Sequence, residues 1–431
     1  MKKQLIFTAI FVISFSVDSF ARQIKVDSDR LHRTLMTLST YGKNAAGGSD
    51  RVAFSKYDIE AREYVKNLMK TAGLEVSIDF AGNIIGRKPG KNAAFKPIAF
   101  GSHIDEVPNG GDYDGPVGSM AAIEVVRTLA EKDLQTDHPL EVIIFANEEG
   151  GVIGSRAIAG NLSQEALQVV SNSGLTQYEG IATLGGNPDR ISEVKRNQGD
   201  LAAYLELHIE QGGILDSENL DIGVVEGIVA IEWWEFTFQG KANHAGTTPM
   251  DQRKDPMLPA ARFVLAVNEI VNSYEGRQVG TVGKIQALPG AGNVIPGEVK
   301  VTVELRDLSS EKIWKIYSEL EVRGQQLASE SQTSLDIRHI EVASKPAMAD
   351  PMIRGIIKSE AEKLGLSTKG LPSGAGHDAQ EMARICPMGM IFIPSKEGIS
   401  HAPTEFSSKE DIANGANVLL QTILELDKKL K

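Results

Sequence analysis

One histidine and two carboxylates follow a short apolar run in the first quarter of the chain. The run begins at Pro97, and His103, Asp105 and Asp114 come directly after it. The apolar residues are typical of a buried strand, and residues 115–132 after them have the pattern of an amphipathic helix. Ligands bind at the carboxyl ends of strands in open α/β sheets, and imidazole with carboxylate suits zinc or a similar divalent ion. A polar loop at a sheet edge is the alternative interpretation.

Three further segments place metal-binding or titratable side chains after predicted strands. Glu148 and Glu149 follow the apolar stretch LEVIIFAN, His208 lies near the end of AAYLELHIEQ, and His401 follows MGMIFIP and a loop. Strands that alternate with helices form mainly parallel sheets, whose carboxyl ends meet at one edge. The sequence therefore predicts that all four segments contribute to one metal site.

The adjacent glutamates have a chemical interpretation of their own. Two neighbouring carboxylates repel each other unless a cation separates their roles. One of the pair can bind a metal ion while the other accepts a proton from water as a general base. A solvated acidic turn after a strand is the alternative.

The elements that position these residues predict an α/β fold with two domains. A mainly parallel sheet with helices is expected over residues 22–213 and 346–431, which would form the catalytic metal-binding domain. Residues 214–345 read β-α-β-β-α-β, the pattern of a self-contained antiparallel sheet with two helices, and predict an inserted α+β domain.

Charge and cysteine content exclude some classes of function. The chain of 431 residues has a formal net charge of −12, which repels phosphate backbones, so nucleic acid is not an expected partner. Cys386 is the one cysteine, which excludes an intramolecular disulfide and a cysteine zinc site.

The N-terminal residues 1–21 have the pattern of a secretory signal peptide. Lys2 and Lys3 precede a short apolar run, and Ser19-Phe20-Ala21 offers a cleavage site. We expect a mature chain that starts near Arg22 and is exported, either to the periplasm or fully secreted. An uncleaved membrane anchor is the alternative, although the apolar run is short for a bilayer span.

The whole mature chain resembles the zinc-dependent amidases of the hydantoinase/carbamoylase family. That group includes N-carbamoyl-L-amino acid hydrolases, β-ureidopropionase and allantoate amidohydrolases, and it belongs to the wider superfamily of di-zinc aminopeptidases, aminoacylases and carboxypeptidases. The matching motifs are GSHIDEVPNGGDYDGPVG, NEEG, LELHIEQGG, GKANHAGTTPMDQRKD, GNVIP, ELRD, SGAGHDA and GISHAPTE.

The resemblance implies two divalent ions per chain. Zn²⁺ is expected, with Mn²⁺ or Co²⁺ as alternatives. The implied ligands are His103 and His208, with Asp114 bridging the two ions and Glu149 and His401 completing the second. It further implies that Asp105 orients His103 and that Glu148 is the general base.

The resemblance also implies that residues 214–345 are a lid and homodimerisation domain. His244 would reach the active site and stabilise the oxyanion, Asn293 would hydrogen-bond the substrate, and Arg306 would bind an α-carboxylate. Gln211 and His377 would also line the substrate site.

The implied activity is hydrolysis of a linear amide or ureido C–N bond in a small carboxylate-bearing molecule, with N-carbamoyl-L-amino acids as the first candidates. An aminoacylase or dipeptidase of the same superfamily, and a binding protein without metals, are the alternatives. Three departures stand out: the leader, a glycine after HIEQG, and a segment after Glu149 that is shorter than in many relatives and lacks their aromatic residue.

Overall fold

Four parallel strands form the centre of the larger domain. The computed structural model describes residues 24–340 and 344–431, so the predicted leader at 1–21 lies outside the described residues. The nine-stranded sheet has the order β1-β2-β4-β3-β5-β15-β6-β13, with β14 also paired to β6. Strands β4, β3, β5 and β15 run parallel, and the antiparallel pairs lie toward the two edges. The prediction of a mainly parallel sheet is confirmed.

The strands of this sheet are short and mostly buried. Their bounds are β1 (Glu75–Ile78), β2 (Ile84–Lys88), β3 (Ile98–Ser102), β4 (Leu140–Ile144), β5 (Ala203–Ile209), β6 (Ile222–Ile228), β13 (Ala347–Met348), β14 (Thr368–Ser373) and β15 (Met388–Ile393). Every residue of β3, β4, β5 and β15 is buried, which explains their nearly continuous apolar sequences.

Helices cover both faces of the sheet. One face packs against α1 (Ser28–Leu38), α2 (Lys56–Thr71), α3 (Pro116–Glu131), α9 (Pro351–Lys363) and α11 (Lys409–Lys429). The other packs against α4 (Ile153–Ala159), α5 (Gln177–Thr183) and α10 (Asp378–Met382). The short helix α6 (Ile214–Glu218) and the 3₁₀ turns η1 (Ala166–Gln168), η2 (Pro188–Val194) and η4 (Lys396–Gly398) lie in connecting segments. No helix in the described ranges is both long and apolar enough to cross a membrane.

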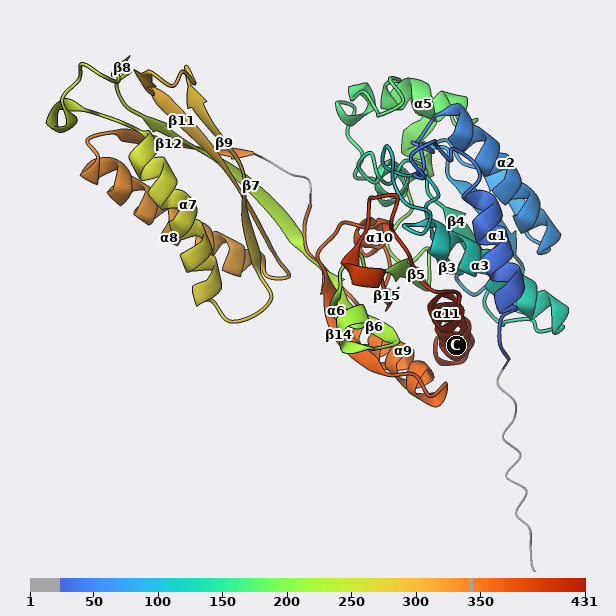
Figure 1. Cartoon of the computed structure of the whole chain (residues 1–431). Helices are drawn as coiled ribbons and strands as arrows, with labels where there is room; N and C mark the ends of the chain where they lie inside the picture. Colours follow the sequence, from blue (N-terminus) through green and yellow to red (C-terminus); the bar gives the residue numbers. More distant parts are fainter. Residues whose placement is uncertain (1–23, 341–343) are drawn as a thin grey trace, which may run out of the picture.

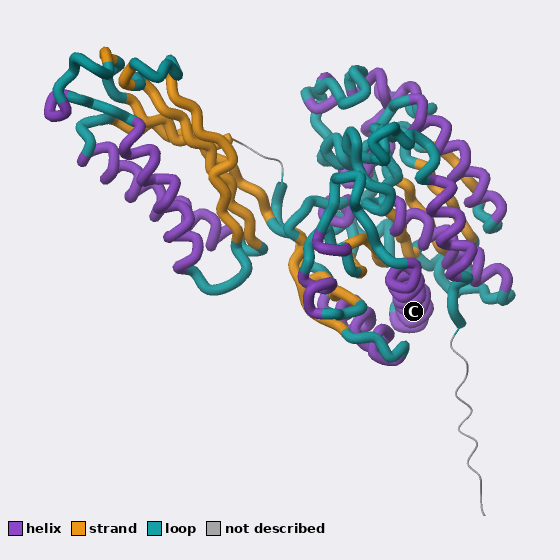
Figure 2. Tube along the Cα trace, in the orientation of Figure 1, coloured by secondary structure: helices purple, strands orange, loops and turns teal. Residues whose placement is uncertain are grey.

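The inserted domain has its own sheet and core. Its four strands have the antiparallel order β12-β7-β11-β9, and two helices pack on one face of the sheet (Figures 1 and 2). The bounds are β7 (Ala230–Gln239), β8 (Asn243–His244), η3 (Met250–Gln252), α7 (Met257–Ser273), β9 (Val279–Leu288), β10 (Val294–Ile295), β11 (Glu298–Asp307), α8 (Ser310–Glu330) and β12 (Ser334–Ile340). The β-α-β-β-α-β order agrees with the sequence pattern, and we call this domain the lid.

The lid begins later than the boundary at residue 214 that the sequence suggested. Residues 222–228 form β6, which pairs with β14 and β15 and therefore belongs to the catalytic sheet. β7 starts at Ala230, two residues after β6 ends, so one nearly continuous extended segment crosses from one domain to the other through Val229 (Figure 1). The alternation of β-forming residues continues across this junction, which concealed the boundary.

Candidate metal centre and catalytic site

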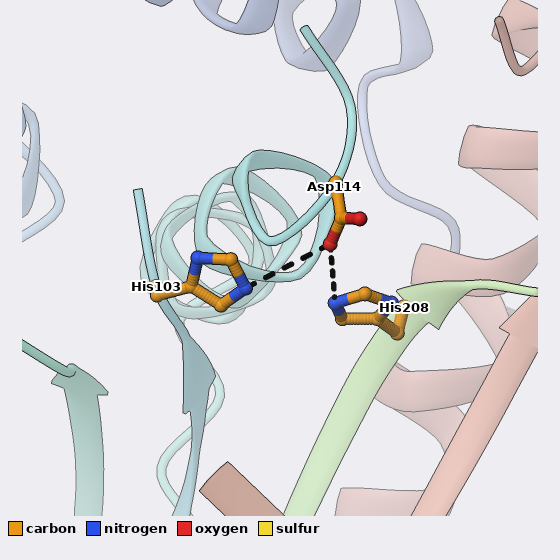
Figure 3. A group of neighbouring side chains, drawn as sticks. All are labelled: His103, Asp114 and His208. Carbon is orange, nitrogen blue, oxygen red and sulfur yellow. Dashed lines mark ion pairs between the residues drawn. The ribbon is translucent and has the colours of Figure 1, made fainter. Parts of the chain in front are cut away.

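Asp114 lies between two imidazoles that come from different strands. His103 follows β3, His208 is in β5, and Asp114 directly precedes the first turn of α3 (Figure 3). The distances from Asp114 Oδ1 are 3.2 Å to His208 Nε2 and 3.8 Å to His103 Nε2. All three side chains are buried, with exposed fractions of 1–2%. Their ligand atoms lie within 4.8 Å of one another.

The other oxygen of Asp114 faces a second group. His401 Nε2 lies 3.2 Å from Asp114 Oδ2 and 3.4 Å from Glu149 Oε1. Asp114, Glu149 and His401 form another set whose ligand atoms lie within 4.8 Å. Asp114 Oδ2 also accepts hydrogen bonds from Gln211 Nε2 at 2.6 Å and Ser400 Oγ at 2.7 Å. One carboxylate therefore presents an oxygen to each of two ligand groups.

The donor set fits two divalent ions. His208 Nε2 and Glu149 Oε1 are buried and have no hydrogen-bond partner among the described residues, although buried polar atoms nearly always have one. Ligand atoms at about 2.0–2.2 Å from one ion lie roughly 3–3.5 Å from each other, close to the spacings around Asp114. Each group also contains imidazole nitrogen and carboxylate oxygen, which zinc, manganese and cobalt accept. Ions shared through Asp114 would provide the missing partners.

The histidines already have the ring orientation that ligation needs. The Nδ1 atoms of His103 and His208 lie 3.0 Å from the backbone oxygens of Asp105 and Ile209. A proton on Nδ1 leaves Nε2 with a free lone pair, which is how backbone acceptors orient ligating imidazoles. His208 thus has one ligating nitrogen, directed at Asp114. A third cluster of Glu206, His208 and His377 cannot hold a separate ion while His208 serves the first.

Electrostatics around Asp114 favour cations. Burial opposes ionisation of Asp114, but the surrounding imidazoles hold its pKa well below the usual value. Against the effect of burial, Asp114 raises the pKa of His208 to about 9, and its hydrogen bond raises the pKa of His401 to about 9. Burial and the nearby Asp114 carboxylate raise the pKa of Glu149 to about 8. These shifts favour protons on the ligand atoms, and because metal ligands must be deprotonated, metal binding competes with protonation at this site.

The two adjacent glutamates are placed differently relative to the ligand groups. Glu149 belongs to the second ligand group, whereas Glu148 is in neither Asp114-centred group. Glu148 Oε2 lies 3.8 Å from His103 Nε2, and the side chain lines the same cavity as Asp114. Burial, Asp378 and Glu149 hold the pKa of Glu148 well above its usual value. A carboxylate that is beside the ligands but outside the ligand groups suits proton transfer.

Asp105 contacts His103 through its backbone rather than through its carboxylate. The carboxylate oxygen Oδ1 is 4.0 Å from His103 Nδ1, while the backbone oxygen is at 3.0 Å. The carboxylate instead accepts the backbone N–H groups of Glu148, at 3.3 Å, and Glu149, at 3.2 Å. Asp105 therefore positions His103 with one group and the glutamate pair with the other.

Glycine at position 115 allows the first ligand group to close. Gly115 has φ +80°, and a Cβ there would lie 2.3 Å from the His103 ring. Ser119 Oγ, one turn into α3, donates to the backbone oxygen of His103 at 2.6 Å. The start of α3 is therefore packed directly against the end of β3.

A cavity of about 410 Å³ adjoins the ligands. Of the residues expected to contact substrate, Gln211, His377 and Arg306 line it. The Arg306 guanidinium pairs with Glu304, at 2.7 and 3.1 Å, and donates through Nη1 to the Gly374 backbone oxygen across the domain junction. Three of its five N–H groups are committed in this way, and among the described residues one each on Nη1 and Nη2 has no acceptor and could bind a substrate carboxylate.

His244 and Asn293 are not brought to this cavity within the chain. They lie together in and beside the small β8–β10 sheet, where Ala245 N donates to Asn293 O at 3.0 Å. Figure 1 shows β8 at the end of the lid farthest from the catalytic domain. Both side chains are exposed. Their predicted contact with substrate needs either movement of the lid or a second copy of the chain.

Glu405 is a positioning residue that the sequence analysis did not single out. Its Oε1 accepts the backbone N–H groups of Tyr113, at 2.8 Å, and Asp114, at 3.1 Å. Its Oε2 accepts Ser400 Oγ, at 2.9 Å, and the His401 backbone N–H, at 3.2 Å. Glu405 is buried and joins the two loops that carry Asp114 and His401. The sequence signal for Glu405 was its position in the GISHAPTE motif. No spacing rule, however, identifies the groups that donate hydrogen bonds to its carboxylate.

The chain is similar to a described protein family, to named relatives and to solved structures. Residues 99–425 match the family model described as Peptidase family M20/M25/M40. The chain is 41% identical over 406 residues to an N-carbamoyl-L-amino acid amidohydrolase of Geobacillus stearothermophilus, which covers 93% of this chain and 99% of that protein. It is 37% identical to a ureidoglycolate hydrolase of Arabidopsis thaliana, with coverage of 96% and 89%. A solved hydantoinase/carbamoylase family amidase from Burkholderia multivorans superposes with a TM-score of 0.87 at 35% identity, with coverage of 94% and 98%.

The role of Glu405 gives a testable prediction. Glu405→Gln should weaken metal binding about 10- to 100-fold. Each carboxylate oxygen of Glu405 accepts two hydrogen bonds, and the amide nitrogen that replaces one of these oxygens in glutamine cannot accept any. Glu410→Gln is the matched control, since Glu410 is exposed in the first turn of α11 and the charge change is the same. Metal affinity is measured by competition with a chromophoric chelator, and circular dichroism checks the fold. Equal affinities in the two variants would contradict the assigned role.

Proposed function

The chain belongs to peptidase family M20/M25/M40, and from that premise we propose that it is a di-zinc amidohydrolase that cleaves the ureido C–N bond of N-carbamoyl-L-amino acids. The observation that carries the proposal is the arrangement of two ligand groups around the oxygens of Asp114. Relatives at 35–41% identity over most of the chain are named N-carbamoyl-L-amino acid amidohydrolases, which supports the substrate class. Manganese and cobalt are the alternative ions.

The residues of the chain divide the chemistry among them. When bound, the two ions polarise the ureido carbonyl and lower the pKa of water toward about 7. Glu148 accepts a proton from the attacking water and later delivers it to the amino-acid nitrogen. A C–O bond forms at the carbonyl carbon and the C–N bond to the amino acid breaks. The carbamic acid that leaves decomposes to carbon dioxide and ammonia.

Orientation of the substrate rests on cavity-lining residues other than the glutamates. The free N–H groups of Arg306 suit a bidentate contact with an α-carboxylate. Gln211, whose amide lies at Asp114, and His377, whose ring packs 4.5 Å from that of His208, border the position of the reacting carbon. Fixing the carboxylate at one end holds the ureido group at the ligands.

A side-by-side substrate panel tests this proposal. Metal-loaded protein should hydrolyse N-carbamoyl-L-alanine faster than N-acetyl-L-alanine or L-alanyl-L-alanine, measured as release of free amino acid. If the protein hydrolysed only the dipeptide or only the N-acyl amino acid, the proposed carbamoylase activity would be rejected in favour of a dipeptidase or an aminoacylase.

Glu148→Gln supplies the control for that panel. The variant should bind two ions yet lose at least about 100-fold in turnover, since general-base catalysis typically contributes 10²–10⁴-fold. A wild-type protein that binds no ions would favour the alternative of a binding protein without metals.

We further propose a homodimer formed through the lid. β9 is an edge strand of the lid sheet, and its Val279, Ile285 and Leu288 are exposed, as is Leu265 on α7. Apolar residues on an open sheet edge favour pairing with another chain. His244 lies at the distal end of the lid, away from the cavity of its own chain. In a dimer, the lid of one chain could bring its His244 to the cavity of the other chain.

Mixed dimers test whether His244 acts on the partner's cavity. Glu148→Gln and His244→Ala chains should each be inactive as homodimers. Co-expression of the two, each with a different affinity tag, should give a heterodimer with one competent site and restored turnover. A monomer in sedimentation velocity, or an inactive heterodimer, would refute the arrangement.

We also propose that the protein is exported, because residues 1–21 have the composition of a cleaved leader. Expressed in full in a Gram-negative host, the chain should be recovered from the periplasmic fraction or the medium with Arg22 as its first residue, as determined by intact mass. Retention in the cytosol with residues 1–21 intact would contradict export.

A further inference from the structure

The segment after the glutamates brings a second arginine to the catalytic cavity. The backbone N–H groups of Gly151 and Val152 both donate to the Glu148 oxygen, at 2.9 and 2.7 Å, and α4 starts at the next residue. Val152 has φ 49°, an uncommon conformation for a β-branched residue, so the turn is unusually tight. Arg156 consequently lies within the first turn of α4 and lines the same cavity as Arg306.

Some N–H groups of the Arg156 guanidinium donate to no described residue. Its Nε and Nη2 donate to the Asn161 backbone oxygen, at 3.3 and 3.2 Å, and this leaves three N–H groups without a partner among the described residues. Within residues 24–340 and 344–431, no carboxylate oxygen lies within 4.0 Å of its guanidinium.

Apart from the general base Glu148 and the metal ligands, the other charged side chains described in the cavity lining are paired. Arg306 is neutralised by Glu304, at 2.7 Å. Glu381 is neutralised by Arg384, also at 2.7 Å. Of the two arginines in the cavity lining, Arg156 is therefore the one whose charge no carboxylate among the described residues balances. An uncompensated guanidinium in a cavity is a recognition element for a ligand carboxylate.

We propose that Arg156 binds a second carboxylate on the substrate, so that the preferred substrates are N-carbamoyl amino acids with acidic side chains. This inference rests on the proposed function and specifies its substrate class. Arg306 would hold the α-carboxylate and Arg156 the side-chain carboxylate, with the ureido group at the ligands between them. For N-carbamoyl-L-aspartate, addition of one water yields L-aspartate, carbon dioxide and ammonia.

An isosteric pair of substrates tests the inference. Metal-loaded wild-type protein should have kcat/KM for N-carbamoyl-L-aspartate about 10- to 100-fold above that for N-carbamoyl-L-asparagine, since a hydrogen bond to a charged group contributes about 1.5–3 kcal/mol. Arg156→Gln should remove this preference with little change for the asparagine derivative, and Arg156→Lys should retain part of it. Arg33→Gln, an exposed arginine on α1, is the matched control and should behave as wild type.

The outcomes separate this inference from the proposed function. Hydrolysis of N-carbamoyl-L-alanine with no preference for the aspartate derivative overturns the role of Arg156 and leaves the function intact. An equal loss on both substrates in Arg156→Gln would also overturn it, because the contact with Asn161 would then be the important one.

If no N-carbamoyl amino acid is hydrolysed, the proposed function fails and ligand binding decides the inference. Calorimetric titration of metal-loaded protein with L-aspartate and L-asparagine should then show tighter binding of aspartate, lost in Arg156→Gln. Equal affinities would overturn the assignment.

Discussion

The structure depends on a buried carboxylate that two sets of side chains share. Asp114 is 2% exposed, and Glu148 and Glu149, which line the same cavity, are only 10% and 9% exposed. Buried carboxylates lose hydration and repel one another, so this arrangement costs free energy unless positive charge is present. Protonated imidazoles provide some of that charge, and divalent ions provide more at the same atoms. Cation binding therefore stabilises the local structure as well as enabling chemistry.

Much of this site could be predicted because parallel strands impose a simple geometry. His103, Glu149, His208 and His401 are separated by as many as 298 positions in sequence, yet His208 lies at the end of β5 and the other three follow the adjacent strands β3, β4 and β15. Continuous apolar runs identify such strands, and their carboxyl ends must meet at one edge. The family motifs then separated Glu148 from Glu149, a distinction that spacing alone left open.

Other features depend on contacts that no linear pattern encodes. Glu405 acts through four hydrogen bonds to two loops, and backbone donors have no sequence signature. The carboxylate of Asp105 was expected to face an imidazole, but two backbone N–H groups compete for it at shorter distances. β6 was assigned to the wrong domain because its apolar pattern continues into β7, and only strand pairing separates them.

The junction at Val229 explains why one lid residue lines the cavity and another does not. Arg306 pairs with Ile231, two residues beyond the junction, and donates to Gly374 in the catalytic domain. His244 follows the far end of β7, with the length of the strand between it and the junction. Any rotation about Val229 moves a point in proportion to its distance from that pivot. A rotation of the lid about that point would therefore displace Arg306 little and the distal β8, which holds His244, much more. A carboxylate held by Arg306 is thus anchored at the junction itself, whereas the oxyanion contact predicted for His244 depends on the second copy of the chain proposed above.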